Sequence, residues 1–390
     1  MRIAIVSGDD FVSDHCGQLS AALASQGHLV TSYVRRRNRS PAGKNTNEDY
    51  RIVPACVGPK TVRSDRDVLP FVGDWAAKLE HLWAADRPDI VHAHGWLGGL
   101  AAQLAAGRQR LPTVQSFEGL AATRSRSIDG PDKDTEGTER QRIEPLLVRN
   151  ANWVTCESTA DANALAKLRH GRARLSVLAG GVDVERYTPV GPAVARDGLH
   201  RVLCLAPNPL LCNGFDMLIR ALPKVAGAEV VVAETTPTDH SHDEARAELK
   251  HLATELGVAD RVRFVGTVVA DDLPMLLRSA DVVAFTPRQP PRATTVLQAM
   301  ASGVAVVALP VGVLLDAVVH AITGLVVSPS NPGELVGALR SLQAQHFQCE
   351  SMGAAGRNRA LSRFTWNRVA LESLTIYRQL SPAYLPTLVS

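Results

Sequence analysis

Short apolar runs alternate with amphipathic stretches along almost the whole chain. Apolar runs of about four to eight residues predict buried strands of a parallel sheet, and apolar positions three and four apart predict the helices between them. The first run, 2–6, is followed by a helical stretch at 16–28, where Gly27 is suited to end a helix. Further predicted strands lie at 29–34, 89–94, 112–117 and 152–158. This alternation is typical of βαβ units.

A second series of the same kind starts after an irregular segment. The periodicity lapses at 186–198, where Pro and Gly accumulate as in an interdomain linker. Predicted strands then follow at 200–207, 228–234, 261–266, 281–287 and 304–309, and the last helical stretch covers 366–380. A chain of 390 residues is too long for one ordinary core. We therefore predict an α/β protein of two Rossmann-like, doubly wound parallel-sheet domains.

Composition narrows the class of protein. The hydrophobic fraction of 45% is that of a globular chain, and no apolar run is long enough to span a bilayer. The start, "MRIAIVSGDD", resembles a first buried strand more than a signal peptide. Six scattered cysteines without a CxxC pair suit a reducing compartment, so we expect a cytoplasmic protein.

Charge gives little evidence of a macromolecular partner. A net charge of +3 is too small to imply nucleic acid. The basic run 35–40, "RRRNRS", is open to two interpretations, contact with an anionic membrane or acidic acceptor, and a solvated loop.

Several segments, in this order, resemble family-4 glycosyltransferases. They are "RPDIVHAHGWLGGLAA", "NWVTCES" with "GGVDVERYTP", "LIRAL", "ELGVADRVRFVG", "LLRSADVVAFTP", "QAMASGVAVVA", "TGLVVSPSNPGELVGALRSL" and "RFTWNRVALESLTIYRQL". The resemblance implies the GT-B fold, with two domains facing a cleft. Residues 1–190 would form the acceptor-side domain, 191–365 the nucleotide-sugar domain, and 366–390 a helix returning to the first. It also implies transfer of a sugar from a nucleotide diphosphate sugar with retention, and no cofactor or metal.

The donor-binding positions depart from the family pattern. A diphosphate leaving group favours cations and backbone N–H groups around it. Where the resemblance implies an Arg and a Lys, this chain has Asn208 and Asn213. Where it implies two glutamates eight residues apart, for the sugar hydroxyls and the ribose, it has Pro290 and Gln298. Proline cannot accept a side-chain hydrogen bond, whereas Gln298 can.

Positions in the first domain also differ. Glu118 replaces the histidine that the resemblance places over the donor sugar, so it is a candidate general base or ligand for a cationic acceptor, or else a partly solvated strand end. His92 and His94 end a predicted strand and are candidates for acceptor contact, or else core histidines. The glycine-rich loop after the first strand is shortened, and Val313 stands where the family has a glycine.

Some groups could compensate for these losses. A helix beginning near Thr294 would present free N–H groups to an anion, and Thr294 or Thr295 could cap it or bind an oxygen. Arg288 and Arg292 could return positive charge, although both would also suit a solvated loop. Losing four hydrogen bonds to charged groups removes about 6–12 kcal/mol if the losses add. A micromolar ligand is bound by only about 8 kcal/mol.

Two functions therefore remain open. One is an atypical glycosyltransferase of the hexosyltransferase class, with a UDP, GDP or ADP sugar as donor. The other is an inactive pseudo-glycosyltransferase that binds a protein partner, carbohydrate or nucleotide. An ordinary Rossmann oxidoreductase is less favoured, because no GxGxxG follows a strand.

Overall fold

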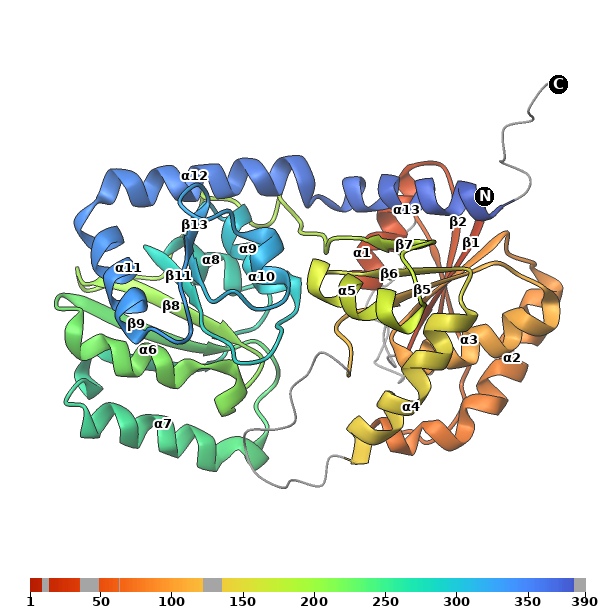
Figure 1. Cartoon of the computed structure of the whole chain (residues 1–390), viewed down its shortest axis with the longest axis horizontal. Helices are drawn as coiled ribbons and strands as arrows, with labels where there is room; N and C mark the ends of the chain where they lie inside the picture. Colours follow the sequence, from red (N-terminus) through yellow and green to blue (C-terminus); the bar gives the residue numbers. More distant parts are fainter. Residues whose placement is uncertain (9–13, 36–48, 63, 122–134, 382–390) are drawn as a thin grey trace. The chain divides into compact units, whose positions relative to one another are not determined.

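The computed structural model describes residues 1–8, 14–35, 49–62, 64–121 and 135–381, with only the backbone of 14 and 135–138. The chain divides into two compact units (Figure 1). The first contains the described residues among Met1–Arg124, Lys133–Gly181 and Trp366–Ser390, and the second contains Val182–Thr365. Most of the basic run 35–40 and much of the loop after the first strand lie outside the described residues.

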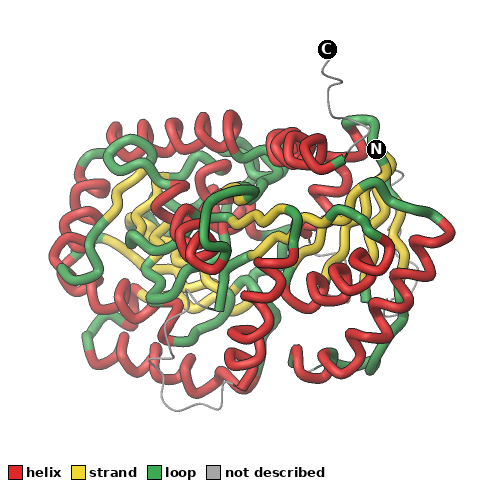
Figure 2. The backbone as a smooth tube through the Cα atoms, turned by 45° about the vertical axis from the view of Figure 1, so that its right-hand side comes forward, coloured by secondary structure: helices red, strands yellow, loops and turns green. Residues whose placement is uncertain are grey.

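The first unit is a parallel sheet with helices on both faces (Figure 2). The sheet order is β3-β2-β1-β4-β5-β6-β7. Its strands are β1 (Arg2–Ser7), β2 (Leu29–Val34), β3 (Arg51–Pro54), β4 (Ile90–His94), β5 (Thr113–Phe117), β6 (Trp153–Cys156) and β7 (Leu175–Val177). Its helices are α1 (Asp14–Ser25), α2 (Val72–Ala85), α3 (Trp96–Gln109), α4 (Thr135–Asn150), α5 (Thr159–Leu168) and α13 (Trp366–Leu380).

Helix α13 belongs to the first unit although it follows the second in sequence. Its apolar positions, among them Val369, Leu374 and Tyr377, are buried in one cluster with residues of β1 and α1. The amphipathic pattern of this helix explains its docking, because one side is apolar and the other is charged.

The second unit has a six-stranded parallel sheet in the order β10-β9-β8-β11-β12-β13. Its strands are β8 (His200–Ala206), β9 (Ala228–Glu234), β10 (Val262–Thr267), β11 (Val282–Phe285), β12 (Ala305–Ala308) and β13 (Gly324–Val326). Its helices are α6 (Phe215–Ala221), α7 (Asp243–Glu255), α8 (Leu273–Arg278), α9 (Ala293–Ala301), α10 (Val313–Ala317), α11 (Pro332–Ala344) and α12 (His346–Arg363). The predicted fold of two Rossmann-like parallel-sheet units is confirmed.

Strand order identifies where a ligand would bind in each unit. The chain moves in opposite directions along the sheet from β1 and β4 in the first unit, and from β8 and β11 in the second. Loops leaving the carboxyl ends of such a strand pair separate and form a crevice, which is the usual ligand site of open α/β sheets.

The structure differs from the predictions in some details. Residues 182–190, assigned to the first domain from sequence, group with the second unit. Three edge strands were not predicted: the four residues of β3 include an arginine and a proline, and β7 and β13 have only three residues each. Arg35 is buried, and its Nη1 donates to the carbonyl oxygens of Val57 and Pro59. It is therefore neither a solvated loop residue nor a membrane contact. Within the described residues, no helix is both long and apolar enough to span a bilayer.

Candidate functional site

In the second unit, the loops after β8 and β11 are tied together at the switch point. Thr286 Oγ1 donates to the carbonyl oxygen of Gly214 over 2.8 Å, and the Arg288 backbone N–H donates to the Cys212 carbonyl over 2.8 Å. Gly214 has a φ of +79°, and a Cβ there would lie 1.7 Å from the Thr286 carbonyl oxygen. Only glycine fits this close approach.

Asn208 and Asn213 lie in the loop after β8 and bind each other. Asn213 Nδ2 donates to the Asn208 carbonyl oxygen over 3.0 Å and to its Oδ1 over 2.6 Å. Asn208 Oδ1 also accepts from the Leu210 N–H at 3.2 Å. The side chains at the positions of the implied Arg and Lys therefore stiffen the loop and bring no charge to it.

Arg288 is paired within the same loops. Its two terminal nitrogens donate to the two carboxylate oxygens of Asp216, at 2.8 and 2.7 Å, and it also donates to the Leu211 carbonyl. Asp216 is buried in the first turn of α6. Such a bidentate pair offsets the positive charge of the guanidinium, so Arg288 attracts a diphosphate more weakly than an unpaired arginine would.

Helix α9 begins at Ala293, which agrees with the predicted start near Thr294. Arg292 is its N-cap, with φ −71° and ψ 153°, and its side chain makes no capping hydrogen bond. Thr294 and Thr295 lie inside the first turn, so neither is the N-cap, and the alternative that one of them binds an oxygen stays a prediction. The first N–H groups of the helix have no intrahelical acceptor, which is the arrangement that attracts anions.

Gln298 and Pro290 lie at the two positions implied to be glutamates. Gln298 is 8% exposed, and its Nε2 donates to the Tyr187 hydroxyl over 2.9 Å. Pro290 packs closely against Gly312, since a Cβ on that glycine would lie 2.8 Å from the Pro290 Cβ. Val313 is buried at the start of α10. Tyr187, which fixes Gln298, could not be found by sequence reasoning because no spacing relates the two.

His92 is a fully satisfied residue of the first unit's core. Its side chain is buried on β4, with Nδ1 2.6 Å from the Tyr377 hydroxyl and Nε2 2.6 Å from Ser116 Oγ. Burial lowers the pKa of His92 well below 6.5, so the ring is neutral. Both ring nitrogens are used, and neither is left for an acceptor.

His94, two residues further on, lacks such partners. Its ring is buried and stacks 4.3 Å from that of His92, centroid to centroid. Among the described residues, neither ring nitrogen of His94 has a hydrogen-bond partner. Burial, and then the nearby His15, lower the pKa of His94 well below 6.5. An unsatisfied buried polar group costs about 1–3 kcal/mol.

Glu118 and His15 lie beside His94. Strands β4 and β5 pair in parallel with His94 opposite Ser116, so Glu118, which directly follows β5, extends from the same edge. His94 Nδ1 is 4.0 Å from Glu118 Oε1, and the His15 and His94 rings are 5.4 Å apart. Sequence reasoning singled out His94 and Glu118 but missed His15, which lies in the first turn of α1, after the switch-point strand β1.

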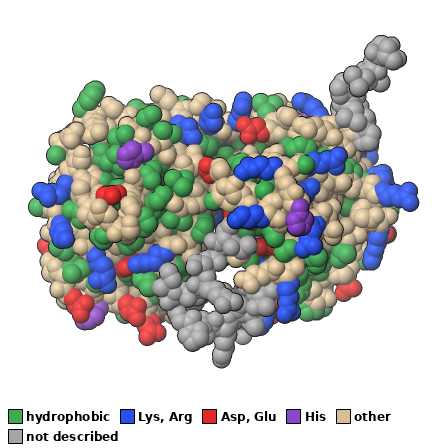
Figure 3. Space-filling model, viewed as in Figure 1, with side chains coloured by type: hydrophobic (Ala, Val, Ile, Leu, Met, Phe, Trp, Pro, Cys, Tyr) green, Lys and Arg blue, Asp and Glu red, His purple; other side chains and the backbone are tan. Residues whose placement is uncertain are grey.

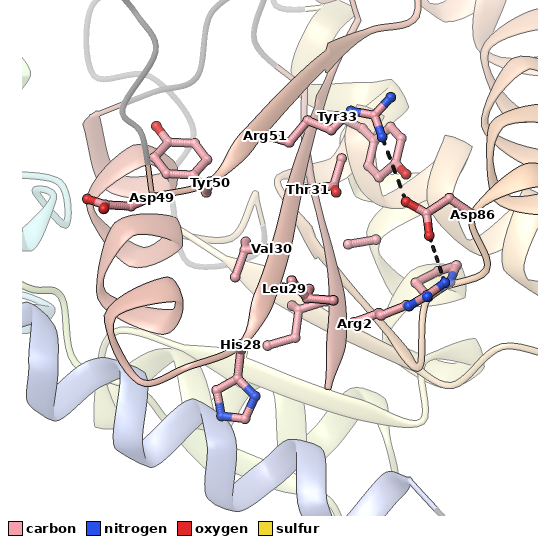
Figure 4. A pocket seen from close by; sticks show the side chains of 13 residues that line it. Arg2, His28, Leu29, Val30, Thr31, Tyr33, Asp49, Tyr50, Arg51 and Asp86 are labelled. Atoms are coloured by element: carbon pink, nitrogen blue, oxygen red, sulfur yellow. Dashed lines mark hydrogen bonds and ion pairs between the residues drawn. The ribbon is translucent and has the colours of Figure 1, made fainter.

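A pocket of about 430 Å³ lies at the opposite ends of the first unit's strands (Figure 4). It is lined by the starts of β1, β2 and β3, where Asp86 holds Arg2 at 2.9 Å and Arg51 at 3.8 Å. Its position at the amino ends separates it from the carboxyl edge that carries His94. On the face shown in Figure 3, basic side chains of the described residues are scattered among acidic ones and form no continuous stripe.

Comparisons with known proteins identify the family. Residues 12–186 match the family model described as Glycosyltransferase Family 4, and residues 212–359 match Glycosyl transferases group 1. A D-inositol 3-phosphate glycosyltransferase of Salinispora arenicola is 30% identical over 322 residues, which are 78% of this chain and 71% of that protein. The chain belongs to the group 1, family 4 glycosyltransferases. A glycogen synthase of Mycobacterium tuberculosis is 26% identical over 97% of this chain and 94% of its own length.

Solved structures agree on the GT-B fold. Sucrose-phosphate synthase of Thermosynechococcus elongatus has a TM-score of 0.84 at 22% identity, covering 98% of this chain and 100% of its own. HepE of Anabaena, solved with UDP and glucose, has a TM-score of 0.74 at 17% identity, covering 97% and 100%. At such identities the likeness shows the fold of this family-4 chain and leaves its site to be argued residue by residue.

Proposed function

We propose that this protein transfers a sugar from a nucleotide diphosphate sugar to an acceptor with retention, and that it holds its donor mainly by the nucleoside. The observation that carries the proposal is the preserved backbone frame of the second unit. The loops after β8 and β11 are tied at the switch point, and α9 begins at the end of the second loop, where Arg292 makes no capping hydrogen bond with its own side chain.

The chain offers different contacts to the ribose, the diphosphate and the sugar of the donor. The ribose would meet Gln298, whose carboxamide oxygen can accept a hydroxyl while Tyr187 fixes its nitrogen. The diphosphate would meet the first N–H groups of α9 and Arg292. The sugar hydroxyls would find no carboxylate to accept their hydrogen bonds at position 290, because Pro290 has no polar side-chain atom.

The donor base is proposed to be uracil, with guanine and adenine as alternatives. HepE, which shares the fold, was solved with UDP and with UDP-glucose. A donor held mainly by its nucleoside would bind about as tightly with the sugar as without it. UDP and UDP-glucose should therefore give similar dissociation constants.

The second candidate is an inactive member that acts as a binding subunit. It is favoured by the mutual bonding of Asn208 and Asn213 and by the pairing of Arg288 with Asp216. These contacts make the loops a self-satisfied polar cluster with little net charge for a diphosphate.

Calorimetric titration of the full chain with UDP, GDP, ADP and their glucose conjugates at low salt separates the two. Micromolar binding of one nucleotide, followed by release of its sugar to water or an acceptor, supports the transferase. The variants Pro290→Glu and Gln298→Glu should each tighten UDP-glucose binding by about 10- to 150-fold, since a hydrogen bond to a charged group contributes about 1.5–3 kcal/mol. Tyr187 can still donate to a glutamate at 298. Glu372→Gln, on the exposed side of α13, is the matched control.

The outcomes differ for the two candidates. If neither the wild type nor the restored variants bind any nucleotide while remaining folded, the transferase proposal is overturned and the binding subunit remains. If Pro290→Glu or Gln298→Glu binds a nucleotide sugar and the wild type does not, the tied loops of the second unit can still hold a donor. The natural protein then does not use that nucleotide sugar.

A further inference from the structure

Three metal-ligating side chains meet at the carboxyl edge of the first unit's sheet. One ligand atom from each of His15, His94 and Glu118 lies within 4.8 Å of the other two. The three residues come from α1, β4 and the end of β5, so separate elements of a rigid sheet-and-helix framework converge on one point.

The state of His94 is independent evidence for a ligand. The fold provides hydrogen-bond partners for both nitrogens of His92, yet it leaves both nitrogens of His94 without a hydrogen-bond partner among the described residues. His94 is 4% exposed, so water reaches it poorly. A buried imidazole without a hydrogen-bond partner can donate a ring-nitrogen lone pair to a cation.

We propose that His15, His94 and Glu118 bind a divalent transition-metal ion, with zinc the best fit. Two imidazole nitrogens and one carboxylate oxygen form a three-ligand zinc set in which the fourth position is open to water. The proposal departs from the family resemblance, which implies no metal, and it does not depend on donor binding in the second unit.

The surroundings suit such an ion. Glu157 Oε1 lies 4.0 Å from His15 Nδ1, so a carboxylate, the group that commonly supports a zinc-bound histidine, is close to this ring. The present separations are wider than those around a bound ion, so the side chains must draw together. His15 and Glu118 are only partly buried and can make that movement, while His94 is held in the core.

The test uses the full chain stripped of metal with a chelator. Zinc titration by calorimetry measures stoichiometry and affinity, and Co²⁺ absorption reports the coordination geometry. The ligand variants are His15→Gln, His94→Gln and Glu118→Gln. The matched control is His251→Gln, which removes an exposed histidine 3.2 Å from Glu255 on α7, a common kind of adventitious metal contact.

We expect one Zn²⁺ per chain and strong visible Co²⁺ bands, with each ligand variant weakening zinc by more than about 100-fold. Outer-shell substitutions alone cost about 10- to 100-fold, so loss of a ligand should exceed that. The control should bind as the wild type does. The proposal is overturned if the wild type takes up no stoichiometric zinc, or if His15→Gln and Glu118→Gln bind it unchanged. These two partly exposed positions decide the matter even if His94→Gln fails to fold.

Discussion

Glu229→Gln should destabilise the second unit strongly. Glu229 and Arg201 are each 1% exposed and lie opposite one another on β9 and β8, with Arg201 Nε 2.7 Å from Glu229 Oε1. Arg263 Nε lies 2.8 Å from the other carboxylate oxygen. The substitution keeps the shape and removes the negative charge, so the Arg201 charge stays buried without its counter-ion. Breaking a buried pair in this way costs about 3–5 kcal/mol.

The loss of stability in the second unit can be told apart from any change in the first by comparing two spectroscopic signals. All five tryptophans lie at positions of the first unit, so their fluorescence follows that unit, whereas far-ultraviolet circular dichroism follows both. With a urea m-value of about 2–3 kcal/mol/M, the unfolding midpoint of the second unit should fall by about 1–2.5 M. The fluorescence transition should remain in place.

A matched control is present in the same unit. Asp271 is 94% exposed and pairs with Arg186 at 2.7 Å, so Asp271→Asn should cost less than about 1 kcal/mol. The double variant Arg201→Met with Glu229→Leu should lose far less than Glu229→Gln, because no buried charge is left unpaired between those two positions. Equal shifts for Glu229→Gln and Asp271→Asn would refute the reasoning.

Three further outcomes are expected. Gly214→Ala should destabilise the second unit and weaken any nucleotide binding, because its Cβ would overlap the Thr286 carbonyl; unchanged urea midpoints would contradict this. Tyr187→Phe should cost about 1 kcal/mol by the same unfolding assay, through the lost hydrogen bond from Gln298; a neutral result would show that the amide finds another acceptor. Burial lowers the pKa of His200 below 6.5, so its stabilising contribution is full above pH 6.5 and is lost as pH falls toward the folded-state pKa. His200→Asn should flatten the acid-side loss of stability, and an unchanged slope would assign that loss to other groups.

Periodicity was enough to predict most strands of the two sheets, since buried parallel strands appear as continuous apolar runs. It failed for β3, where Arg51 and Pro54 give no such run, and for β7 and β13, which are only three residues long. It also failed at 182–190, because contacts rather than composition decide to which unit these residues belong. The start of α9 near Thr294 was predicted, but its N-cap was not, because arginine is an unusual N-cap residue.

The candidate sites were only partly predictable. The family resemblance indicated that Asn208, Asn213 and Gln298 occupy donor-binding positions. It did not indicate that the two asparagines hydrogen-bond to each other or that Gln298 donates to Tyr187. These partners depend on loop geometry, which no local pattern encodes. His15 was missed for a similar reason, as it meets His94 only through the adjacency of β1 and β4.

The placement of α13 has a consequence for how the protein is made. The hydroxyl of Tyr377, which meets the ring of His92 in the first unit's core, is supplied by a residue translated after the whole second unit. The described residues of the second unit run from Val182 to Thr365, so they are all translated before α13. The first unit cannot complete this apolar cluster until α13 has been made, so apolar side chains of β1 and α1 lack that cover while the second unit is being synthesised. Chaperone capture of this protein should therefore depend on its N-terminal half, although that half is translated first.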